Sequence, residues 1–271
     1  MSIITEKETA MLMQNIGVTL ANYLSVAMGA IDLLTKKFEE SDDTEVLEYL
    51  AMARHSQFEV LNIVDNMREL GTDVLGETYL QLNTVNINDL CFKLISSIKK
   101  YINDKGINLV YNPDPNEITL TADYARIERM LIGLFANSIS HCDSGDSIQL
   151  SVSSDDEKVY LVLSDNGEGI NDQTLPILFD DYLREIENYD ANKGAGLGMS
   201  VCESIARQHG GSIIVTSAAG TGTSVSVSLP KVYKAFLGMA TNGQYGNLKE
   251  WSILTGLSTV LSHKKYIHSA R

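Results

Sequence analysis

Two long stretches with helical periodicity at the N-terminal end constrain the fold of this chain more than any other feature. Over residues 8–38, apolar side chains recur at spacings of three and four, close to the seam of a coiled coil: Ile16, Leu20, Tyr23, Ala27, Ile31, Leu34 and Phe38. A second stripe over roughly residues 44–70 comprises Val46, Leu50, Ala53, Gln57, Val60, Val64 and Met67. The polar segment at 39–44 separates the two, which predicts an antiparallel helical hairpin.

A hairpin of two helices leaves part of its apolar surface exposed to water. Two copies of the hairpin would bury that surface in a four-helix bundle, so we expect a homodimer. The alternative is a hairpin that packs onto a second domain of its own chain.

The chain changes character after the hairpin. Residues 71–78 resemble a linker, and mixed helical and strand patterns follow. We expect helices at 86–104, capped by Asn88, at 123–141 and at 199–209. We expect strands at 107–111, 117–120, 147–153, 158–164, 211–217 and 223–229, the last two as a hairpin. The fold class is therefore α+β: a helical hairpin followed by an α/β sandwich with helices on one face of a sheet.

Three segments result from these patterns. Residues 1–72 form the hairpin, residues 79–230 form the α/β domain, and residues 231–271 are a C-terminal extension of unknown role. A helix near 247–262 is expected in that extension, where it would pack on the body or bind a partner.

Composition excludes several classes of function. The formal net charge is -14, which repels nucleic acid and anionic membranes. The apolar stretches fall short of a membrane span, and the N-terminus has no signal-peptide pattern. Three cysteines without metal-ligand spacing favour reduced thiols. We therefore expect a cytoplasmic protein.

The first chemical motif is DNGEG, which begins at Asp165 directly after a predicted strand. A carboxylate at a strand end can accept a hydrogen bond from an exocyclic amine such as that of adenine. Gly167 and Gly169 would let the backbone pass close to a ligand. Alone the motif is weak evidence for a binding site, because ordinary β-turns contain the same residues.

The second motif is GAGLG at 194–198, at the start of a predicted helix. Glycine-rich loops at helix N-termini present free amides to phosphate groups. The pattern also resembles a dinucleotide fingerprint, but no early βαβ unit surrounds it.

The third feature is Asn137, on the apolar helix over 123–141. Its amide oxygen is a suitable ligand for Mg2+, although an asparagine at the edge of an apolar stripe is usually structural. His141 lies one turn further along, where it could contact phosphate or simply end the helix.

Taken in order, Asn137, DNGEG, GAGLG and the GTGT of the final hairpin resemble the N, G1, G2 and G3 boxes of the GHKL ATPase superfamily, most closely its histidine kinase branch. LFDDYLR at 178–184 is similar to the F box of that branch. The resemblance covers roughly residues 80–230.

The resemblance implies a site for ATP and Mg2+. Asn137 would hold the metal, with His141 near the phosphates, and Asp165 would bind the adenine amine with Thr223 beside the ring. The pocket and its lid would be shaped by Gly167, Gly169, Gly194, Gly196, Leu197 and Gly198. Residues 180–193 would form the lid, from which Arg184 and Lys193 would reach the phosphates.

The chain departs from the family at three positions. Four residues before Asn137 the ATP-hydrolysing branches carry a glutamate base, and this chain has Gly133, which makes efficient hydrolysis doubtful. The stretch ANYLSVAMGAIDLL at 21–34 resembles the segment that follows the phosphoacceptor histidine in this family, and in that alignment the acceptor and the acid after it fall on Val18 and Thr19. His55 is a substitute acceptor, although an exposed helical histidine is more often simply a surface residue.

These observations favour a histidine-kinase-like signalling protein that is degenerate or acts through a partner, which would be a response regulator or a partner kinase. A second hypothesis is a non-catalytic scaffold whose nucleotide controls the binding of a response regulator. A third is a phosphotransfer protein that uses His55. Anti-sigma serine kinases share the nucleotide boxes but usually lack the long hairpin.

Overall fold

The computed structural model describes residues 6–39, 44–171, 197–232 and 249–267. The chain divides into two compact units. The first comprises Met1–Thr78 with Leu254–Arg271, and the second comprises Tyr79–Ile253. The predicted class is confirmed, since a helical region is followed by an α/β sandwich.

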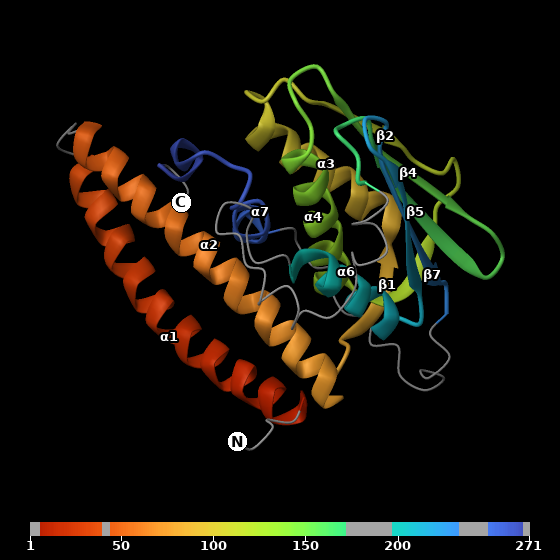
Figure 1. The fold of residues 1–271 in the computed structure, drawn as a ribbon, viewed down its shortest axis with the longest axis horizontal. Helices are drawn as coiled ribbons and strands as arrows, with labels where there is room; N and C mark the ends of the chain where they lie inside the picture. The colour runs from red at the N-terminus through yellow and green to blue at the C-terminus, as the bar shows by residue number, and fades with distance from the viewer. Residues whose placement is uncertain (1–5, 40–43, 172–196, 233–248, 268–271) are drawn as a thin grey trace. The chain divides into compact units, whose positions relative to one another are not determined.

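The first unit is built on two long helices, α1 (Glu6–Glu39) and α2 (Thr44–Leu75), which lie side by side (Figure 1). The buried positions of α1 recur at helical spacing and are mostly small or flexible: Ala10, Met13, Gly17, Met28 and Thr35. At Gly17 an added Cβ would lie within 3.1 Å of the Arg68 Cδ, so the glycine gives that side chain its space.

The predicted apolar stripe of α1 is not the face that the helix buries within a single chain. Ile16, Leu20, Tyr23 and Leu34 are all exposed, the last two by 70% and 45%. The helix carries two apolar stripes, and the stripe with small residues is the one that faces α2, because small side chains let the helix axes approach. The other stripe stays on the surface of the chain.

The predicted linker at 71–78 is also partly wrong, because α2 continues to Leu75. Gly71 is buried inside the helix, and a Cβ there would lie 3.1 Å from the carbonyl oxygen of Ala10. The glycine therefore serves helix packing rather than a break. The helix ends at Gly76, whose φ of 68° is the left-handed conformation typical of a helix C-terminus.

By length and composition, residues Lys7–Phe38 of α1 would be sufficient to cross a membrane. The expectation that all apolar stretches fall short of a span is therefore not met. Only 11% of that window is buried in the structure, so its apolar surface faces outward. Length and composition are weak evidence for a span, because buried core helices and signal sequences near an N-terminus have the same properties.

The second unit contains two sheets. Strands β1 (Leu82–Asn86) and β3 (Thr119–Asp123) pair antiparallel. The larger sheet has the order β2-β4-β5-β7-β6. In it β2 (Asn108–Asn112) runs parallel to β4 (Ser147–Ser154), and the other neighbours are antiparallel: β5 (Lys158–Asp165), β7 (Gly222–Pro230) and β6 (Ser212–Ala218).

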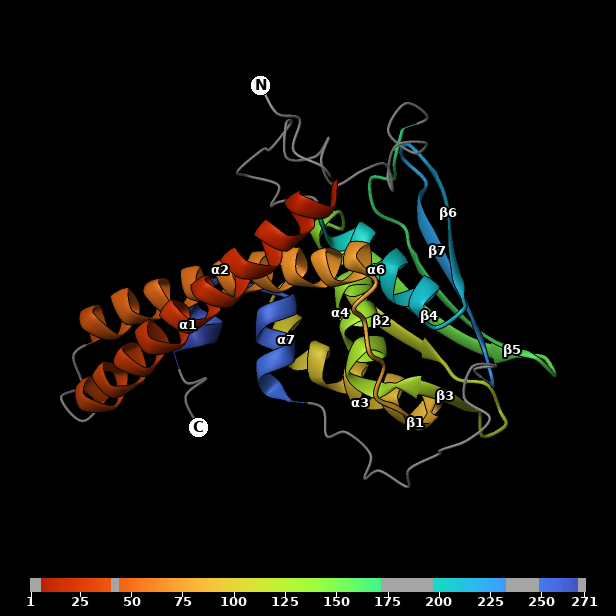
Figure 2. The same cartoon turned by 90° about the horizontal axis from the view of Figure 1, so that it is seen from below.

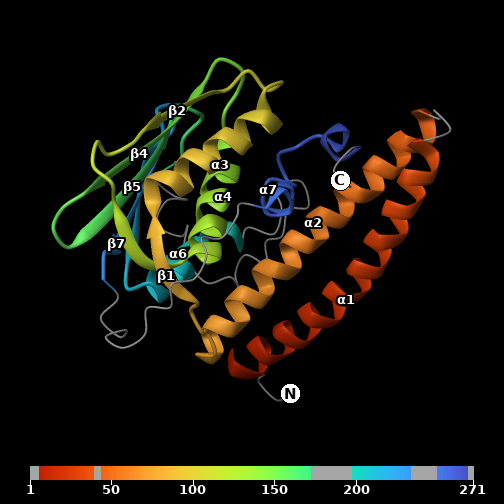
Figure 3. The same cartoon turned by 180° about the vertical axis from the view of Figure 1, so that it is seen from behind.

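Three helices cover one face of the larger sheet: α3 (Ile87–Ile102), α4 (Tyr124–Ser140) and α6 (Leu197–Gln208). Figures 2 and 3 show these helices stacked on the same side of the strands. Strands β4 and β5 alternate buried and more exposed residues, with Ile148, Leu150, Leu161 and Leu163 turned inward. The helices bury their own apolar stripes against this face.

Two local predictions differ from the structure. Strand β1 was not expected, since LNTVN is short and three of its five residues are polar. The N-cap of α3 is Asn86, whose side chain accepts from the Asp89 backbone N–H at 3.0 Å. Asn88 instead donates its amide to the carbonyl oxygens of Asp114 and Asn116. Both asparagines suit a cap, and the pairing of β1 with β3 decides which one caps the helix.

The C-terminal extension has less helix than predicted. Helix α7 covers Glu250–Gly256, and a single 3-10 turn, η2, covers His263–Tyr266. In the second unit Glu250 accepts a short hydrogen bond from the Tyr101 hydroxyl on α3. In the first unit, residues 254–267 bury Leu254, Leu257 and Tyr266.

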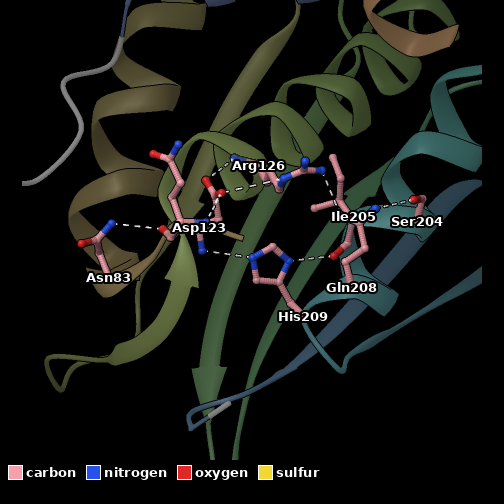
Figure 4. Close-up of polar contacts among 8 residues, drawn as sticks. Asn83, Asp123, Arg126, Ser204, Ile205, Gln208 and His209 are labelled. Atoms are coloured by element: carbon pink, nitrogen blue, oxygen red, sulfur yellow. Dashed lines mark hydrogen bonds and ion pairs between the residues drawn. The ribbon is translucent and has the colours of Figure 1, made fainter. Parts of the chain in front are cut away.

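A polar cluster joins the start of α4 to the end of α6 (Figure 4). His209 is 2% exposed, and its Nε2 accepts from the Asp123 backbone N–H at 3.1 Å. Its Nδ1 must then donate to the Ile205 carbonyl oxygen, at 2.8 Å, which defines a neutral tautomer. Beside it, Arg126 donates to Gln208 at 2.9 Å. The two helix ends are thereby held together.

Glu128 is the buried acid of α4. It is 5% exposed, and burial raises its pKa to about 7, against the lowering effects of a hydrogen bond to Ser252 and the charge of Lys249. A raised pKa means that the folded state binds the proton more tightly than the unfolded state does. The free energy of unfolding therefore falls as pH rises from the unfolded pKa, 4.5, to about 7.

We expect Glu128→Gln to match the wild type in thermal stability at pH 4.5 and to exceed it at pH 8, by up to roughly 3 kcal/mol. The amide keeps the hydrogen-bonding shape without the buried charge. Thermal denaturation at both pH values measures this, with the exposed Glu157→Gln as the control. A variant that stays equal to the wild type at pH 8 would contradict the assignment.

Candidate functional site

Asp165, at the end of β5, is the central side chain of the site. Its Oδ1 accepts from the backbone N–H groups of Gly167 at 3.2 Å and Thr223 at 3.1 Å, and its Oδ2 accepts from the Ser138 hydroxyl at 2.8 Å. A carboxylate has about four acceptor positions, so one is left for an external N–H donor. The residue is half-buried, which leaves that position accessible.

Glycines allow the backbone to close tightly around this carboxylate. An added Cβ at Gly167 would overlap the His141 carbonyl, and one at Gly222 would overlap the Asp165 carbonyl. Gly169 has a φ of 68° and lies against Ala218. No side chain fits at these positions, so glycine is required whether or not a ligand is bound.

The Thr223 hydroxyl is held by Ser217 of β6. Ser217 donates to the Gly222 carbonyl at 2.8 Å and accepts from the Ile170 N–H at 2.8 Å, so the 2.9 Å bond between the two hydroxyls is donated by Thr223. The oxygen of Thr223 keeps its lone pairs. A ligand bound at Asp165 would therefore meet an acceptor at Thr223.

Asn137 precedes Ser138 on α4 and lies beside the start of α6. An added Cβ at Gly198 would be 3.7 Å from the Asn137 Oδ1. The side-chain amide of Asn137 makes no hydrogen bond to the residues that the structure describes. Leu197 is buried at the N-terminus of α6, where backbone N–H groups lack helical partners. An amide oxygen beside such donors fits Mg2+ and phosphate, with water completing the metal coordination.

His141 ends α4 and contacts the DNGEG turn. Its Nδ1 lies 2.5 Å from the Glu168 Oε1, and its carbonyl accepts from the Glu168 N–H at 3.1 Å. Both side chains are exposed. Cys142 follows, and burial, then the charge of Asp165, raises its pKa to about 12, so the thiol stays neutral.

Four predicted site residues lie outside the described residues: Arg184, Lys193, Gly194 and Gly196. The predicted lid at 180–193 and the motif at 178–184 lie outside them as well. The structure brings Asn137, Asp165, Gly167, Gly169, Gly198 and Thr223 into one region through the contacts described above. Among the described parts of the chain, no cluster of three His, Cys, Asp or Glu side chains forms a metal cage.

Sequence reasoning missed three residues of the site. Ser138, which donates to Asp165, Ser217 and Glu168 were not among the predicted site residues. Ser138 adjoins Asn137, and Ser217 is paired with Thr223 across the β6–β7 hairpin. The register of the predicted hairpin could have identified Ser217, because it places this residue opposite Thr223.

His55 belongs to the first unit and is not the exposed surface residue that was expected. Its side chain is 21% exposed, and its Nε2 lies 2.7 Å from the Ser258 carbonyl oxygen. Val18 is 46% exposed, and the Thr19 hydroxyl donates to the Asn15 carbonyl of its own helix.

Comparison with known proteins agrees with this geometry. Residues 122–233 match the family of histidine kinase-, DNA gyrase B- and HSP90-like ATPases. The chain is 30% identical over 169 residues to the signal transduction histidine-protein kinase BaeS of Escherichia coli strain K12, covering 62% of this chain and 36% of that protein. It is 26% identical over 214 residues to the adaptive-response sensory kinase SasA of Microcystis aeruginosa, covering 78% and 55%.

Solved histidine kinases share the fold. Full-length ShkA in complex with AMPPNP matches with a TM-score of 0.61 and 20% identity, over 78% of this chain and 45% of that one. The kinase AdeS of Acinetobacter baumannii matches with a TM-score of 0.55 and 18% identity, over 75% and 95%. The chain thus contains a GHKL catalytic domain of the histidine kinase type. It spans from about a third to about half of the length of the curated relatives named above.

Gly133 has a structural role that the sequence did not reveal. An added Cβ there would lie 3.0 Å from the Cys202 Sγ on α6. That thiol is buried and donates to the Met130 carbonyl at 3.4 Å, so it cannot easily move aside. Because Gly133 of α4 has no side chain, the Cys202 thiol of α6 can occupy the space beside it.

We expect Gly133→Ala to lower the free energy of unfolding in the wild type and to raise it in Cys202→Ala. In the wild type the methyl group meets the thiol, which destabilises the fold by about 1–3 kcal/mol. In Cys202→Ala the same change fills the vacated space and gains up to about 1 kcal/mol of helix propensity. Urea denaturation of the two single variants and the double variant measures this cycle. Purely additive effects would show that the two positions do not share this space.

Proposed function

We propose that this chain is a soluble, cytoplasmic histidine-kinase-like signalling protein that binds ATP with Mg2+ at the Asp165 site. The supporting observation is the Asp165 carboxylate, which three elements hold with one acceptor position left over. That position suits the adenine amine. ShkA, the similar structure with AMPPNP, supports a nucleotide of this class for the fold.

Asn137 would supply the one protein ligand of the metal, since its amide oxygen has no hydrogen bond to the described residues and lies beside Gly198. The metal would neutralise phosphate charge, which matters in a chain with a net charge of -14. His141, held by Glu168, would stand at the rim near the phosphates. Lid residues Arg184 and Lys193 would complete the charge neutralisation.

We expect Asp165→Asn to weaken ATP binding by at least about 10-fold, because a hydrogen bond to a charged acceptor contributes roughly 1.5–3 kcal/mol. The new amide would also face the N–H groups of Gly167 and Thr223. Isothermal titration calorimetry with Mg2+ and ATP measures the affinity. Asp156→Asn, in an exposed turn, is the matched control. If folded Asp165→Asn bound ATP with unchanged affinity, Asp165 would not be the acceptor of the adenine amine.

The exposed stripe of α1 supports the proposed homodimer. Its members are large apolar side chains in water: Leu12, Ile16, Leu20, Tyr23, Val26, Leu33 and Leu34. One stripe of α1 packs on α2 and the other is left over, which is the arrangement that a four-helix bundle of two hairpins needs.

We expect Tyr23→Glu to shift the chain from dimer to monomer, because a carboxylate would be buried in the bundle. Analytical ultracentrifugation over a concentration series measures the association. Tyr79→Glu is the matched control, since Tyr79 is 88% exposed and lies outside the helices. Equal sedimentation of the two variants as dimers would place the interface elsewhere.

A non-catalytic scaffold is the second candidate, and the acceptor position favours it. Val18 cannot take a phosphoryl group, and Thr19 bonds to its own helix. In this case ATP would control the binding of a response regulator by the hairpin. Incubation with γ-labelled ATP and Mg2+ separates the two candidates. Acid-labile label on the chain or on an added partner kinase would support transfer, and nucleotide binding without label would support the scaffold.

A further inference from the structure

The C-terminal part of the first unit, residues 254–267, lies on α2 and covers His55. Tyr266 is fully buried, and its ring lies 5.0 Å from the His55 ring and 5.1 Å from the Phe58 ring, measured between centroids. Its hydroxyl donates to the Leu254 carbonyl at 2.9 Å, which closes the segment into a loop. We call residues 254–267 the C-terminal cover.

The cover also satisfies two nitrogen donors of α2. Arg54 is 3% exposed and pairs with Asp32 of α1 at 2.5 Å, and its Nη1 donates to the Tyr266 carbonyl at 3.3 Å. Carbonyl oxygens accept only, so the 2.7 Å bond from His55 to the Ser258 oxygen is donated by Nε2. While that bond stands, Nε2 carries its proton and has no lone pair for attack on phosphorus.

The cover is held without covalent bonds. All three cysteines are free and belong to the second unit. The Ser258 hydroxyl is buried without a hydrogen-bond partner among the described residues, which offsets part of the stabilisation from the buried apolar side chains. A segment that is held without covalent bonds and contains such an unsatisfied group is suited to local opening.

We propose that the C-terminal cover is a detachable lid on a phosphoryl-acceptor site, and that its release exposes the His55 imidazole beside the Arg54 guanidinium. With the cover released, the neutral imidazole changes tautomer through solvent: Nδ1 takes up a proton, Nε2 gives up its own, and the freed Nε2 lone pair forms a bond to phosphorus. The bond from phosphorus to the leaving group breaks, and the leaving group takes up a proton. Arg54, no longer bonded to Tyr266, binds the phosphoryl oxygens.

Phosphoramidate tests this without ATP, so the result is independent of the nucleotide site. Its P–N bond breaks and ammonia leaves. The full-length wild type and Tyr266→Ala are treated with it, and phosphohistidine is located by mass spectrometry at neutral pH. We expect His55 to be labelled at least about tenfold faster in Tyr266→Ala, because the wild type must first open the cover. The exposed His141 should react equally in both.

Tyr266→Phe is the matched control, since it keeps the ring contacts and removes one hydroxyl bond, and it should stay close to the wild type. If Tyr266→Ala does not fold, Leu261→Ala replaces it with the same expectation. Hydrogen exchange reports whether 254–267 has opened. Wild-type His55 that reacts as fast as His141, or an opened cover without faster labelling of His55, would overturn the proposal.

Discussion

The close antiparallel packing of α4 on α6 at Gly133 is the contact on which the candidate site depends. The Cys202 thiol occupies the space that a side chain on Gly133 would need, so the two helices lie close together at their middle. At one end, Asp123 and His209 hold the pair in register through the His209 ring. At the other end the same register brings Asn137 beside the first turn of α6. A shift of one turn would separate the amide from the helix N-terminus that makes it useful.

The Asp165 carboxylate organises the remainder of the site. It accepts from α4 through Ser138, from its own turn through Gly167, and from β7 through Thr223. These bonds fix its orientation before any ligand arrives, so binding costs little reordering of the side chain. The acid therefore has two roles at once: it joins three elements of the fold, and it keeps one acceptor position for a ligand.

The sequence predicted most elements of the second unit within a few residues, because helical and alternating periods are distinct there. It placed Asp165, Asn137 and Thr223 in one site through the family resemblance rather than through periodicity. The sequence-based predictions were wrong where two local patterns were equally favourable and only tertiary packing distinguished them. On α1 two apolar stripes compete, and the small residues around Gly17 decide which is buried. Gly71 resembled a break because its packing partner, Ala10, is sixty-one positions away in the chain.

Retained nucleotide boxes are weaker evidence for catalysis than they first suggest, since several of their residues are needed by the fold itself. Gly167 and Gly222 are glycines because neighbouring carbonyl groups fill the space of a Cβ. A chain that had lost ATP binding would keep them to stay folded. Asn137 is different: its amide bonds to none of the described residues, so folding does not account for it. The presence of Asn137 is thus the better argument for a ligand.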